Sequence, residues 1–497
     1  MTEPLSAPRL AQPDWITESL ALGLAEPGHE SLQRRLYRLL RGGIQLGRLP
    51  GGSALPASRA LASALGIGRN TVLAAYDQLL AEGFLETRHG AGTFVAHHAL
   101  GQVQQTVRPA TATSLSQRGR GLLEQSRGPI GESGAFAPCV PDFEQFPRDI
   151  WQGLLQRHQR QAPSHWFNYQ DGGGLPALRE ALCDYLQLSR SVRCQPEQIL
   201  IVSGAKQALD LIAGLLTDPG DTAWIEEPGY RGAQASLLNA GLGMVPVPVD
   251  AEGLDLARAP AGPAPRLIYT TPSHQLPTGV TMSLPRRLAL LALAEAQQSW
   301  IIEDDYDSEF RYSSQPVASL QGLAQSERVL YLGTFSKVMY PGLRLAYLIL
   351  PPALVEPFRI TQARRYPEGH YPLQAALAEF IAAGHFARHI RRMRELYRAR
   401  QHCLRDSLAP ALDQGLQLSP GESGMHLVAW LPLGSDEQAL VGTGERHRVI
   451  LRPLGRHYLG GQTQAGLVLG YAGVPEAEIR HAGGLLADWL TPFLKET

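Results

Sequence analysis

Residues 58–95 show a helical period of apolar positions that changes to a strand period. Pro56-Ala57-Ser58 offers an N-cap, the apolar positions of 61–65 form the stripe of a short helix, and Gly66 ends it. A second helix follows and stops at Gly83, because apolar side chains recur at i, i+3, i+4, i+7 and i+8: Val72, Ala75, Tyr76, Leu79 and Leu80. The next segment, FLETRHGAGTFV, reads as two strands around a glycine-rich turn. The pattern predicts a helix-turn-helix followed by a β-wing.

From about residue 135 onward, short apolar runs alternate with amphipathic helical patterns. QILIVSG precedes AKQALDLIAGLL, RLIYTTP precedes LPRRLALLALAEA, and SWIIEDDY and RVLYLGTF are further apolar runs. Strands that alternate with helices in this way predict an α/β domain with a mostly parallel sheet.

The stretch between these two zones, residues 100–134, is rich in Gln, Ser, Thr, Gly and Arg and has little periodicity, which is typical of a flexible linker. A chain of 497 residues is also too long to fold around one hydrophobic core, since single cores stop growing at about 250–300 residues. We therefore expect an N-terminal extension over 1–30, a small helical domain over 31–99, the linker over 100–134 and a large domain over 135–497.

The net charge of the chain is −1, which by itself argues against a nucleic-acid partner. Residues 31–99 depart from this average, because they hold eight arginines and three acidic residues. The second helix also carries Arg69, Asn70, Thr71 and Gln78 on its polar face, and these side chains can reach base edges or phosphates. An ordinary helical domain with a solvated basic face would share some of these features. The charge excess together with the wing favours double-stranded DNA as the partner.

Cysteine usage and apolar runs limit the other classes of protein. The four cysteines, at positions 139, 183, 194 and 403, form no C-x-x-C pair, so neither a zinc site nor a disulfide framework is indicated. The N-terminus has no apolar run of the signal-peptide kind, and the most apolar stretch, residues 288–294, is far shorter than a membrane span. We expect a soluble cytoplasmic protein without a metal site.

The segment RLPGGSALPASRALASALGIGRNTVLAAYDQLLAEGFLETRHGAGTFV resembles the winged helix-turn-helix of GntR-type bacterial repressors over nearly its full length. The shared elements are the LPxSR-x-LA turn, the GxxRNTV start of the recognition helix, the AYxxLxxEG exit and the GxGTFV wing. The resemblance implies that five residues lie at the DNA surface: Arg59, Arg69, Asn70, Thr71 and Gly92. Phosphate contacts would then dominate the affinity and make it fall steeply with salt.

Lysine is rare in this chain, since only Lys206, Lys337 and Lys495 stand among 45 basic side chains. Each lysine therefore carries diagnostic weight, because arginine cannot do amine chemistry. Lys337 follows an apolar β-run in YLGTFSKVMYPGLRLAY, close to two hydroxyl side chains and to Arg344. Such a setting suits a Schiff-base lysine near an anion.

Two other strand ends carry matching groups. SWIIEDDYDSEF places Asp304, Asp305 and Tyr306 at the carboxyl end of a buried strand, where open α/β sheets bind ligands. A carboxylate there can keep a pyridine nitrogen protonated, and a Tyr hydroxyl can bond a ring oxygen. IVSGAKQALDL combines a strand, a glycine turn and a helix N-terminus, whose N–H groups suit a phosphate. Each feature alone has an ordinary structural explanation, but their order along the chain is hard to obtain by chance.

This set of features resembles the fold-type I pyridoxal-phosphate (PLP) enzymes, the aspartate-aminotransferase superfamily, from about Phe136 to the C-terminus. The resemblance implies that Lys337 binds the cofactor covalently and that Tyr306 contacts its ring hydroxyl oxygen. Asp304 or Asp305 would pair with the ring nitrogen, with Asp304 preferred. The remaining implied contacts are the ring-stacking Tyr230, the Ala205–Lys206–Gln207 phosphate turn, and Thr334 and Arg344 beside it.

Two departures from the family pattern bear on function. YTTPSHQLPTG is similar to the aminotransferase NPTG loop, but Leu276 replaces its Asn, and Gln275 and His274 are the candidate substitutes. The late strand that carries the substrate-carboxylate Arg in aminotransferases reads GLVLGYAG, with Val468 in place of that Arg. Arg452 and Arg456 are nearby candidates, or surface arginines of an Arg-rich chain. Loss of this contact makes ordinary transamination doubtful, because positioning lowers reaction barriers.

A GntR-like domain, a linker and an aminotransferase-like domain in this order resemble the MocR family of bacterial transcription regulators. The resemblance implies a head-to-tail homodimer and a PLP-responsive regulator of vitamin B6 or amino-acid and amine metabolism, with PLP or a PLP-reactive amine as effector. One alternative is an active PLP aminotransferase with an accessory N-terminal domain. Another is a regulator whose large domain has lost PLP and serves for dimerisation alone.

Overall fold

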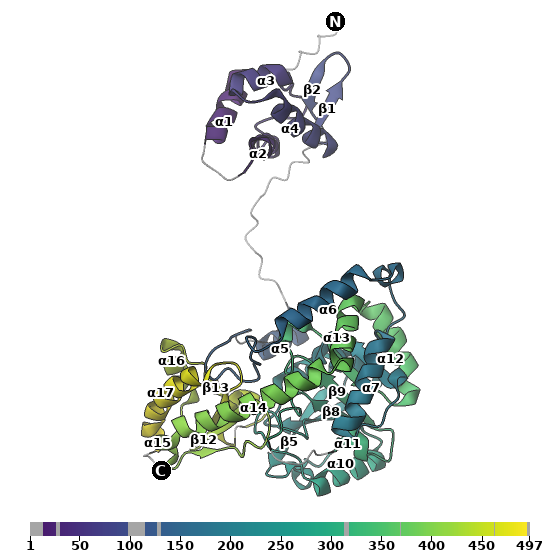
Figure 1. Cartoon of the computed structure of the whole chain (residues 1–497), viewed down its shortest axis with the longest axis vertical. Helices are drawn as coiled ribbons and strands as arrows, with labels where there is room; N and C mark the ends of the chain where they lie inside the picture. The colour runs from purple at the N-terminus through teal and green to yellow at the C-terminus, as the bar shows by residue number, and fades with distance from the viewer. Residues whose placement is uncertain are drawn as a thin grey trace. The chain divides into compact units, whose positions relative to one another are not determined.

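The computed structural model describes residues 13–25, 30–97, 115–126, 131–312, 318–367, 369–461 and 463–494. It divides into two compact units, Met1–Ser114 and Leu115–Thr497, which are drawn in Figure 1. The exact domain borders predicted from the sequence stay predictions, because residues 98–114 and 127–130, within and beside the expected linker, lie outside the described residues. Lys495 also lies outside them.

The smaller unit contains a helix-turn-helix and a two-stranded wing. Its elements are α1 (Pro13–Ala25), α2 (Leu32–Gln45), α3 (Ser58–Leu65), α4 (Arg69–Ala81), β1 (Leu85–Arg88) and β2 (Gly92–Val95). Gly66 ends α3 with a φ of 65°, a left-handed conformation that glycine adopts without strain. The expected side-chain cap of α3 is absent, because Ala57 takes the N-cap position and Ser58 is the first helical residue. β1 and β2 pair antiparallel from Leu85–Val95 to Arg88–Gly92.

Helix α1 lies within the segment that the sequence suggests as a plain extension. Leu20 of α1 is buried, and Arg35 of α2 donates a hydrogen bond to the Gly23 carbonyl at 3.1 Å. A Cβ at Gly23 would lie 2.7 Å from the Leu39 side chain, so the glycine permits close helix packing. This helix is hard to predict from the sequence, because Pro8 and Pro13 stand at its start. Residues 13–25 therefore belong to the core of the smaller unit.

The larger unit is built on an eight-stranded sheet in the order β3-β10-β9-β8-β7-β4-β5-β6. Neighbours from β9 to β5 run parallel, while β10 is antiparallel to both β3 and β9, and β6 is antiparallel to β5. The predicted α/β class with a mostly parallel sheet is confirmed. The strands are β3 (Ile199–Val202), β4 (Thr222–Glu227), β5 (Gly243–Asp250), β6 (Gly253–Leu254), β7 (Leu267–Thr270), β8 (Trp300–Asp305), β9 (Val329–Thr334) and β10 (Ala346–Ile349).

A second, four-stranded antiparallel sheet has the order β11-β12-β14-β13. Its strands are β11 (Gln417–Leu418), β12 (His426–Leu431), β13 (Arg452–Pro453) and β14 (Ala465–Gly470). The long helix α14 (His385–Ser407) runs between the part of the unit with α6, α7 and α13 and the part with α15 to α17 (Figure 1). No helix of the described part of the chain is long and apolar enough to cross a membrane.

Helices surround both sheets. The α-helices are α5 (Gln117–Ser126), α6 (Arg148–Arg160), α7 (Pro176–Arg190), α8 (Ala205–Leu216), α9 (Arg231–Asn239), α10 (Leu284–Gln297), α11 (Leu320–Leu323), α12 (Pro352–Arg365), α13 (Tyr371–Ala382), α14, α15 (Ala409–Leu412), α16 (Glu437–Arg446) and α17 (Glu476–Leu494). The 3-10 turns are η1 (Ser164–Phe167), η2 (Pro196–Gln198), η3 (Leu256–Arg258), η4 (Pro341–Leu343) and η5 (Leu454–His457).

Helix α5 lies in the range that the composition suggests as a flexible linker. It packs against α9, and a Cβ at Gly121 would lie 3.7 Å from the Leu238 side chain. The expectation of a structureless segment is therefore wrong for residues 117–126. Gly121, one of the glycines that suggest a linker, instead lies in the contact between the two helices.

Candidate cofactor cavity and DNA-binding surface

A cavity of about 410 Å³ opens at the edge of the large sheet. Gln207 and Asp305 do not line it, but eight of the residues that the sequence suggests for a cofactor do: Ala205, Lys206, Tyr230, Asp304, Tyr306, Thr334, Lys337 and Arg344. The other lining residues are Cys139, Gly204, Tyr269, Thr271, Leu276, Ser336 and Pro341. Residues spread over more than 200 positions thus meet in one place.

The sheet topology explains this convergence. β8 and β9 are parallel neighbours, so the segments after Asp305 and Thr334 leave at the same edge. β3 is antiparallel to β10, which is antiparallel to β9, so β3 also ends at that edge. Ligand groups gather outside the carboxyl ends of strands in open α/β sheets, and this cavity follows that rule.

The two adjacent aspartates have different surroundings. Asp304 lines the cavity, accepts a hydrogen bond from the Tyr269 hydroxyl at 2.5 Å, and has a buried second oxygen, Oδ1, without a partner among the described residues. Burial raises the pKa of Asp304 to about 7. Asp305 is not part of the cavity lining and forms an ion pair with Arg190 at 2.7 Å. Oδ1 of Asp305 is also buried without a partner among the described residues, so the cavity lining is what separates the two. The geometry favours Asp304 as the partner of a ring nitrogen, because its unpartnered oxygen belongs to a residue that lines the cavity.

Lys337 is half-buried, and its Nζ donates a hydrogen bond to the Cys139 carbonyl at 3.0 Å. Cys139 itself has a φ of 59°, a left-handed conformation, and lines the cavity. Burial raises the pKa of the Cys139 thiol to about 11, so the thiol stays neutral beside the amine. The lysine amine is thus held inside the cavity by a backbone acceptor.

The N-terminus of α8 and Arg344 form an anion seat at one end of the cavity. Gly204 is the N-cap of α8, has a φ of 122° and makes no side-chain cap hydrogen bond. A Cβ at Gly204 would lie 3.5 Å from the Arg344 guanidinium, so a side chain would crowd the seat. Helix N-terminal N–H groups beside a guanidinium suit a phosphate. Gln207, the third residue of the expected phosphate turn, instead accepts a hydrogen bond from the Ser203 N–H at 2.6 Å.

Two tyrosines form an aromatic wall. Tyr230 is the N-cap of α9, and its ring stacks near that of Tyr269 with centroids 6.4 Å apart and an interplanar angle of 29°. Burial raises the pKa of both hydroxyls, so both remain protonated near neutral pH. Tyr269 was missed in the sequence because it reads as an ordinary β-position of RLIYTTP. Cys139 carries no sequence signal either, since it precedes any recognisable motif.

The structure separates the two candidate substitutes for the missing Asn of the NPTG-like loop. Gln275 points to the Glu226 carboxylate at 3.1 Å and the Pro228 carbonyl at 2.8 Å, away from the cavity. His274 lies behind Tyr306, with Nδ1 3.0 Å from the Tyr306 hydroxyl. Leu276 itself lines the cavity. Neither candidate reaches the position of the Asn, but His274 contacts a residue that does line the cavity.

Three buried side chains near this point, His274, Asp307 and His426, have possible metal-ligand atoms within 4.8 Å of one another. Protein partners already engage these groups, because His274 Nδ1 lies 3.0–3.1 Å from both Asp307 oxygens and His426 Nε2 donates to the Pro277 carbonyl at 2.9 Å. Hydrogen bonding therefore accounts for the cluster.

The position of the missing carboxylate-binding Arg is apolar. Val468 packs with Val428 and Leu454 on one face of the small sheet. Arg452 pairs in register with Val468 and forms an ion pair with Glu132. Neither Arg452 nor Arg456 lines the cavity.

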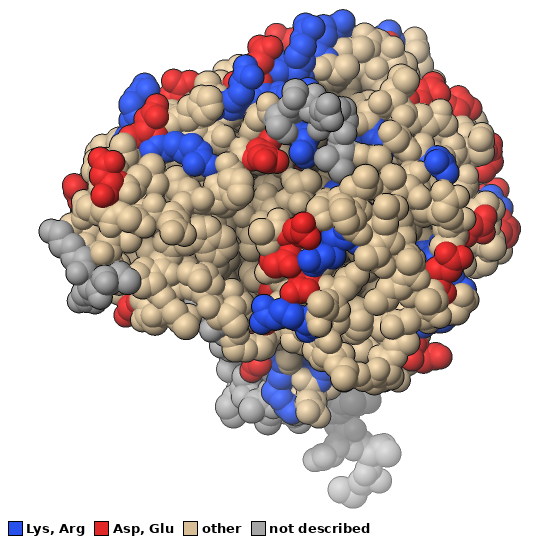
Figure 2. Space-filling view, turned by 90° about the horizontal axis from the view of Figure 1, so that it is seen from below, with Lys and Arg blue, Asp and Glu red and all other residues tan. Residues whose placement is uncertain are grey.

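The DNA-binding residues expected from the sequence surround the start of α4. Arg59, Arg69 and Asn70 are exposed, Thr71 is half-buried, and Arg69 Nε lies 3.5 Å from Ser58 Oγ at the start of α3. Gly92 is exposed at the tip of the wing with a φ of 111°. On the face of the molecule drawn in Figure 2, in contrast, acidic and basic side chains are interspersed between wide uncharged areas.

Comparison with known proteins gives two family matches in one chain. Residues 32–95 match the bacterial regulatory proteins of the gntR family, and residues 141–483 match aminotransferase class I and II. The chain is 42% identical to the probable rhizopine catabolism regulatory protein MocR of Rhizobium meliloti, over 90% of this chain and 92% of that protein. It is 32% identical to the pyridoxine biosynthesis transcriptional regulator PdxR of Corynebacterium glutamicum, over 94% and 98%.

Among solved structures, Pyrococcus horikoshii kynurenine aminotransferase is similar with a TM-score of 0.66 at 25% identity, covering 80% of this chain and 98% of that one. The likeness covers the larger unit, whose fold is that of the PLP-dependent aminotransferases, while the relatives that span nearly the whole chain are regulators. The chain therefore belongs to the MocR family of transcription regulators, in which a GntR-type winged helix-turn-helix precedes an aminotransferase-like domain.

Proposed function

We propose that this regulator binds PLP at Lys337 and that occupancy or reaction of the cofactor changes how its winged helices bind a promoter. The observation that carries the proposal is the cavity itself, where an amine, an anion seat and a buried, unpartnered carboxylate oxygen lie together. Each group fits one part of PLP: its aldehyde carbon, its phosphate and its ring nitrogen. When bound, PLP supplies a carbonyl carbon that reacts with primary amines.

The chain's own residues hold the cofactor in fixed ways. The α8 N-terminus, Lys206, Thr334 and Arg344 would bind the phosphate, while Tyr230 would stack on the ring and Tyr306 would donate to its hydroxyl oxygen. Asp304 would hold a proton between its carboxyl group and the ring nitrogen. Burial raises the pKa of Asp304 to about 7, so sharing this proton is more favourable than leaving a buried carboxylate without a partner. Lys337, whose Nζ donates to the Cys139 carbonyl at 3.0 Å, would supply the amine that holds the cofactor.

The effector is PLP or a primary amine that competes with Lys337 for it. Replacement of Lys337 by another amine would change the charge and packing inside the cavity. A ligand shifts the equilibrium between two conformations of a protein only by the difference between its affinities for them. The names of two relatives refer to pyridoxine biosynthesis and rhizopine catabolism. Genes of vitamin B6 or of amine and amino-acid metabolism are accordingly the expected targets, and the cytoplasm is the expected location.

The alternative, an active aminotransferase, finds less support in the cavity. The cations that line it, Lys206, Lys337 and Arg344, all lie at the amine or at the phosphate end. Arg452 is held by Glu132, so the described residues offer a substrate carboxylate no charged partner inside the cavity. An unpaired carboxylate in a buried site is costly, so an amino acid would be poorly positioned. Sustained multiple turnover of an amino acid with a keto acid would support the enzyme.

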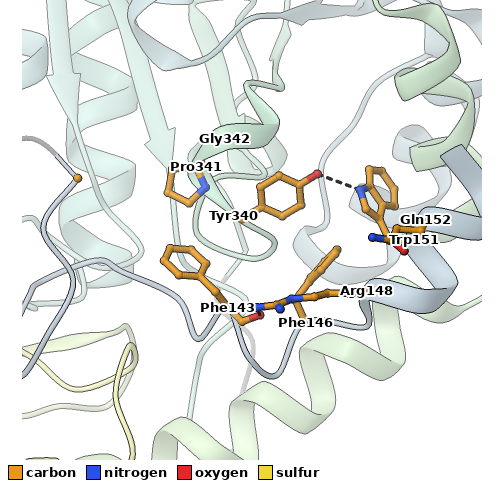
Figure 3. A pocket seen from close by; sticks show the side chains of 9 residues that line it. Phe143, Phe146, Arg148, Trp151, Gln152, Tyr340, Pro341 and Gly342 are labelled. Carbon is orange, nitrogen blue, oxygen red and sulfur yellow. Dashed lines mark hydrogen bonds between the residues drawn. The ribbon is translucent and has the colours of Figure 1, made fainter. Parts of the chain in front are cut away.

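A homodimer is part of the proposal. Phe167 and Tyr169 are 78% and 84% exposed on the segment that includes η1, an unusual degree for two nearby aromatic side chains. An apolar cavity of about 460 Å³ lies beside Pro341, and Figure 3 shows Phe143, Phe146 and Tyr340 around it, with the Trp151 indole donating to the Tyr340 hydroxyl at 2.9 Å. A head-to-tail partner would cover both apolar surfaces. Sedimentation of the full chain tests this: a monomer at micromolar concentration contradicts it.

The cofactor assignment is tested by Lys337→Ala in the full chain. Wild-type protein should show the visible absorbance of lysine-bound PLP, and the variant should lose it, because Lys337 supplies the amine while Lys206, the other lysine of the lining, lies at the phosphate end. A promoter footprint that responds to PLP or an amine in the wild type should become unresponsive in the variant. Lys337→Ala with intact absorbance overturns the assignment of the lysine. Wild-type protein that never acquires the absorbance would support the other hypothesis, a regulator whose large domain has lost PLP and serves for dimerisation alone.

A further inference from the structure

A buried histidine–carboxylate pair lies directly behind Tyr306, outside the cavity lining. His274 Nδ1 is 3.0 Å from the Tyr306 hydroxyl and 3.1 and 3.0 Å from Asp307 Oδ1 and Oδ2. His274 and Asp307 are 2% and 1% exposed, so water does not compete for these contacts. The pair belongs neither to the anion seat nor to the aromatic wall.

The hydrogen-bonding capacities of the three groups determine where the protons are. An ionised carboxylate only accepts, so the hydrogen on His274 Nδ1 points toward Asp307. A nitrogen that carries this hydrogen cannot accept one from Tyr306. The Tyr306 hydroxyl therefore finds no acceptor at Nδ1, and its O–H is left to donate elsewhere, on the side of the ring that faces the cavity.

Two glycines hold the imidazole in this position. A Cβ at Gly424 would lie 1.8 Å from His274 Cε1, and a Cβ at Gly279 would lie 3.2 Å from Nε2. Both glycines have positive φ, 87° and 77°, which other residues adopt only with strain. The His274 Nε2 atom is buried and makes no hydrogen bond among the described residues. The ring is thus fixed by shape around it and by Asp307 on one nitrogen.

We infer that the His274–Asp307 pair directs the Tyr306 O–H into the cavity and thereby tunes the protonation of PLP bound at Lys337. The inference rests on the proposed cofactor and makes His274 and Asp307 positioning residues, since neither lines the cavity. It also gives a role to the histidine of the PSHQLPTG loop, in which Leu276 stands where the aminotransferase NPTG pattern has Asn.

The surrounding titratable groups support a protonated Tyr306. Burial, followed by the charge of Asp307, raises the pKa of Tyr306 well above its usual range, so the hydroxyl keeps its hydrogen. The other ionisable groups near Tyr306 and His274 are Cys139, Glu226, Asp304, Lys337 and His426. Burial lowers the pKa of His426, which leaves that imidazole neutral.

The test is a pH titration of the visible absorbance of the full-length, PLP-loaded protein. A donor on the ring oxygen stabilises its negative charge, which weakens the hold of that oxygen on the proton of the cofactor–lysine nitrogen and lowers the pH at which the proton leaves. His274→Phe keeps the ring shape but removes Nδ1, so the midpoint of the titration should rise by about one pH unit. Asp307→Asn should move it in the same direction by less, which keeps the test decisive if the first variant fails to fold.

A double variant separates positioning from a general structural effect. Tyr306→Phe should raise the midpoint by itself, and adding His274→Phe should then change it by less than about 0.2 pH units, because the hydroxyl it acts through is gone. His158→Phe removes another histidine–carboxylate pair, His158–Glu379 at 2.7 Å, away from the cavity and should leave the midpoint unchanged. An unchanged midpoint in both His274→Phe and Asp307→Asn overturns the inference, as does a full additional shift in the Tyr306→Phe background. Wild-type protein without visible absorbance overturns the proposed cofactor and this inference with it.

Discussion

The two units of the chain place their functional side chains in opposite settings. Arg59, Arg69 and Asn70 of the smaller unit stand exposed on helices whose opposite face forms the core. Asp304 and Tyr306 of the larger unit are buried, and their side chains contact the buried Tyr269 and His274 at 2.5 and 3.0 Å. Substitution of an exposed binding residue usually leaves the stability of the fold unchanged. Substitution of a buried one is expected to reduce both ligand binding and stability.

The same difference appears in the charges. The arginines of the recognition surface leave an excess of positive charge for a polyanion, while the buried arginines of the larger unit are matched by acids, as in Arg190–Asp305 and Arg400–Asp142, both at 2.7 Å. The net charge of −1 sums over both units and therefore does not show the positive excess of the recognition surface. A local count of charges is therefore more informative about partners than the total.

The comparison predicts that the units unfold separately. Leu79 is completely buried in the core of the smaller unit, and Leu79→Ala should lower that unit's free energy of unfolding by about 3 kcal/mol. Thermal unfolding followed by far-ultraviolet circular dichroism should show the loss, while the visible absorbance of the larger unit melts unchanged. The matched control is Leu46→Ala, since Leu46 is 70% exposed and should cost less than about 0.5 kcal/mol. Parallel shifts of both transitions would contradict separate units.

A surface substitution should affect DNA binding alone. Arg69→Ala at the start of α4 should weaken specific binding by about 10- to 100-fold, as expected for loss of one base or phosphate contact. Fluorescence anisotropy with the promoter DNA measures the affinity, and the unchanged visible spectrum shows that the cavity is intact. If the slope of log affinity against log salt falls by about one, Arg69 contacts a phosphate; if it does not, Arg69 contacts a base. Binding within twofold of wild type would remove Arg69 from the interface.

A buried substitution should change the pH dependence of stability. The folded protein free of cofactor keeps a proton on Asp304 up to a pKa of about 7, whereas the unfolded chain loses it near its usual value of 3.8. Unfolding therefore releases this proton between the two values, and the contribution of Asp304 makes the free energy of unfolding fall as pH rises. Relative to Asp304→Asn, wild-type protein should lose about 1 kcal/mol between pH 5.5 and 6.5 in denaturant titrations. Equal slopes for the two proteins would contradict the raised pKa.

The smallest effect is expected where the cavity meets solvent. Lys206 lines the cavity but is itself exposed, so Lys206→Gln should weaken PLP binding only about two- to fivefold. Spectroscopic titration of cofactor-free protein with PLP gives the dissociation constant. Arg344→Gln is the matched comparison and should weaken binding more, because its guanidinium lies over Gly204 at the helix N-terminus. The opposite order would place the phosphate nearer Lys206.

The sequence predicted most where function depends on a local pattern. The wing, the turn at Gly66 and the residues around Lys337 are each contained in a short segment with a recognisable period or motif. It could not choose between Asp304 and Asp305, because that choice depends on Arg190, more than 100 residues away. It likewise could not place His274 behind Tyr306, since Gly424 and Asp307 determine that position from other segments. Helix α5 was not predicted because glycine is a helix breaker in the local sequence. The contact of Gly121 with α9 is tertiary, so the local sequence does not indicate it.

The contact between α5 and α9 has a mechanical consequence. α9 begins immediately after Tyr230, whose ring forms part of the cavity wall, and α5 rests on the side of the same short helix. α5 is also the first helix of the larger unit after residues 98–114, so the helix next to that segment in the chain packs against the helix that follows Tyr230. We expect a displacement of the Tyr230 ring to act on α9 and, through this contact, on α5.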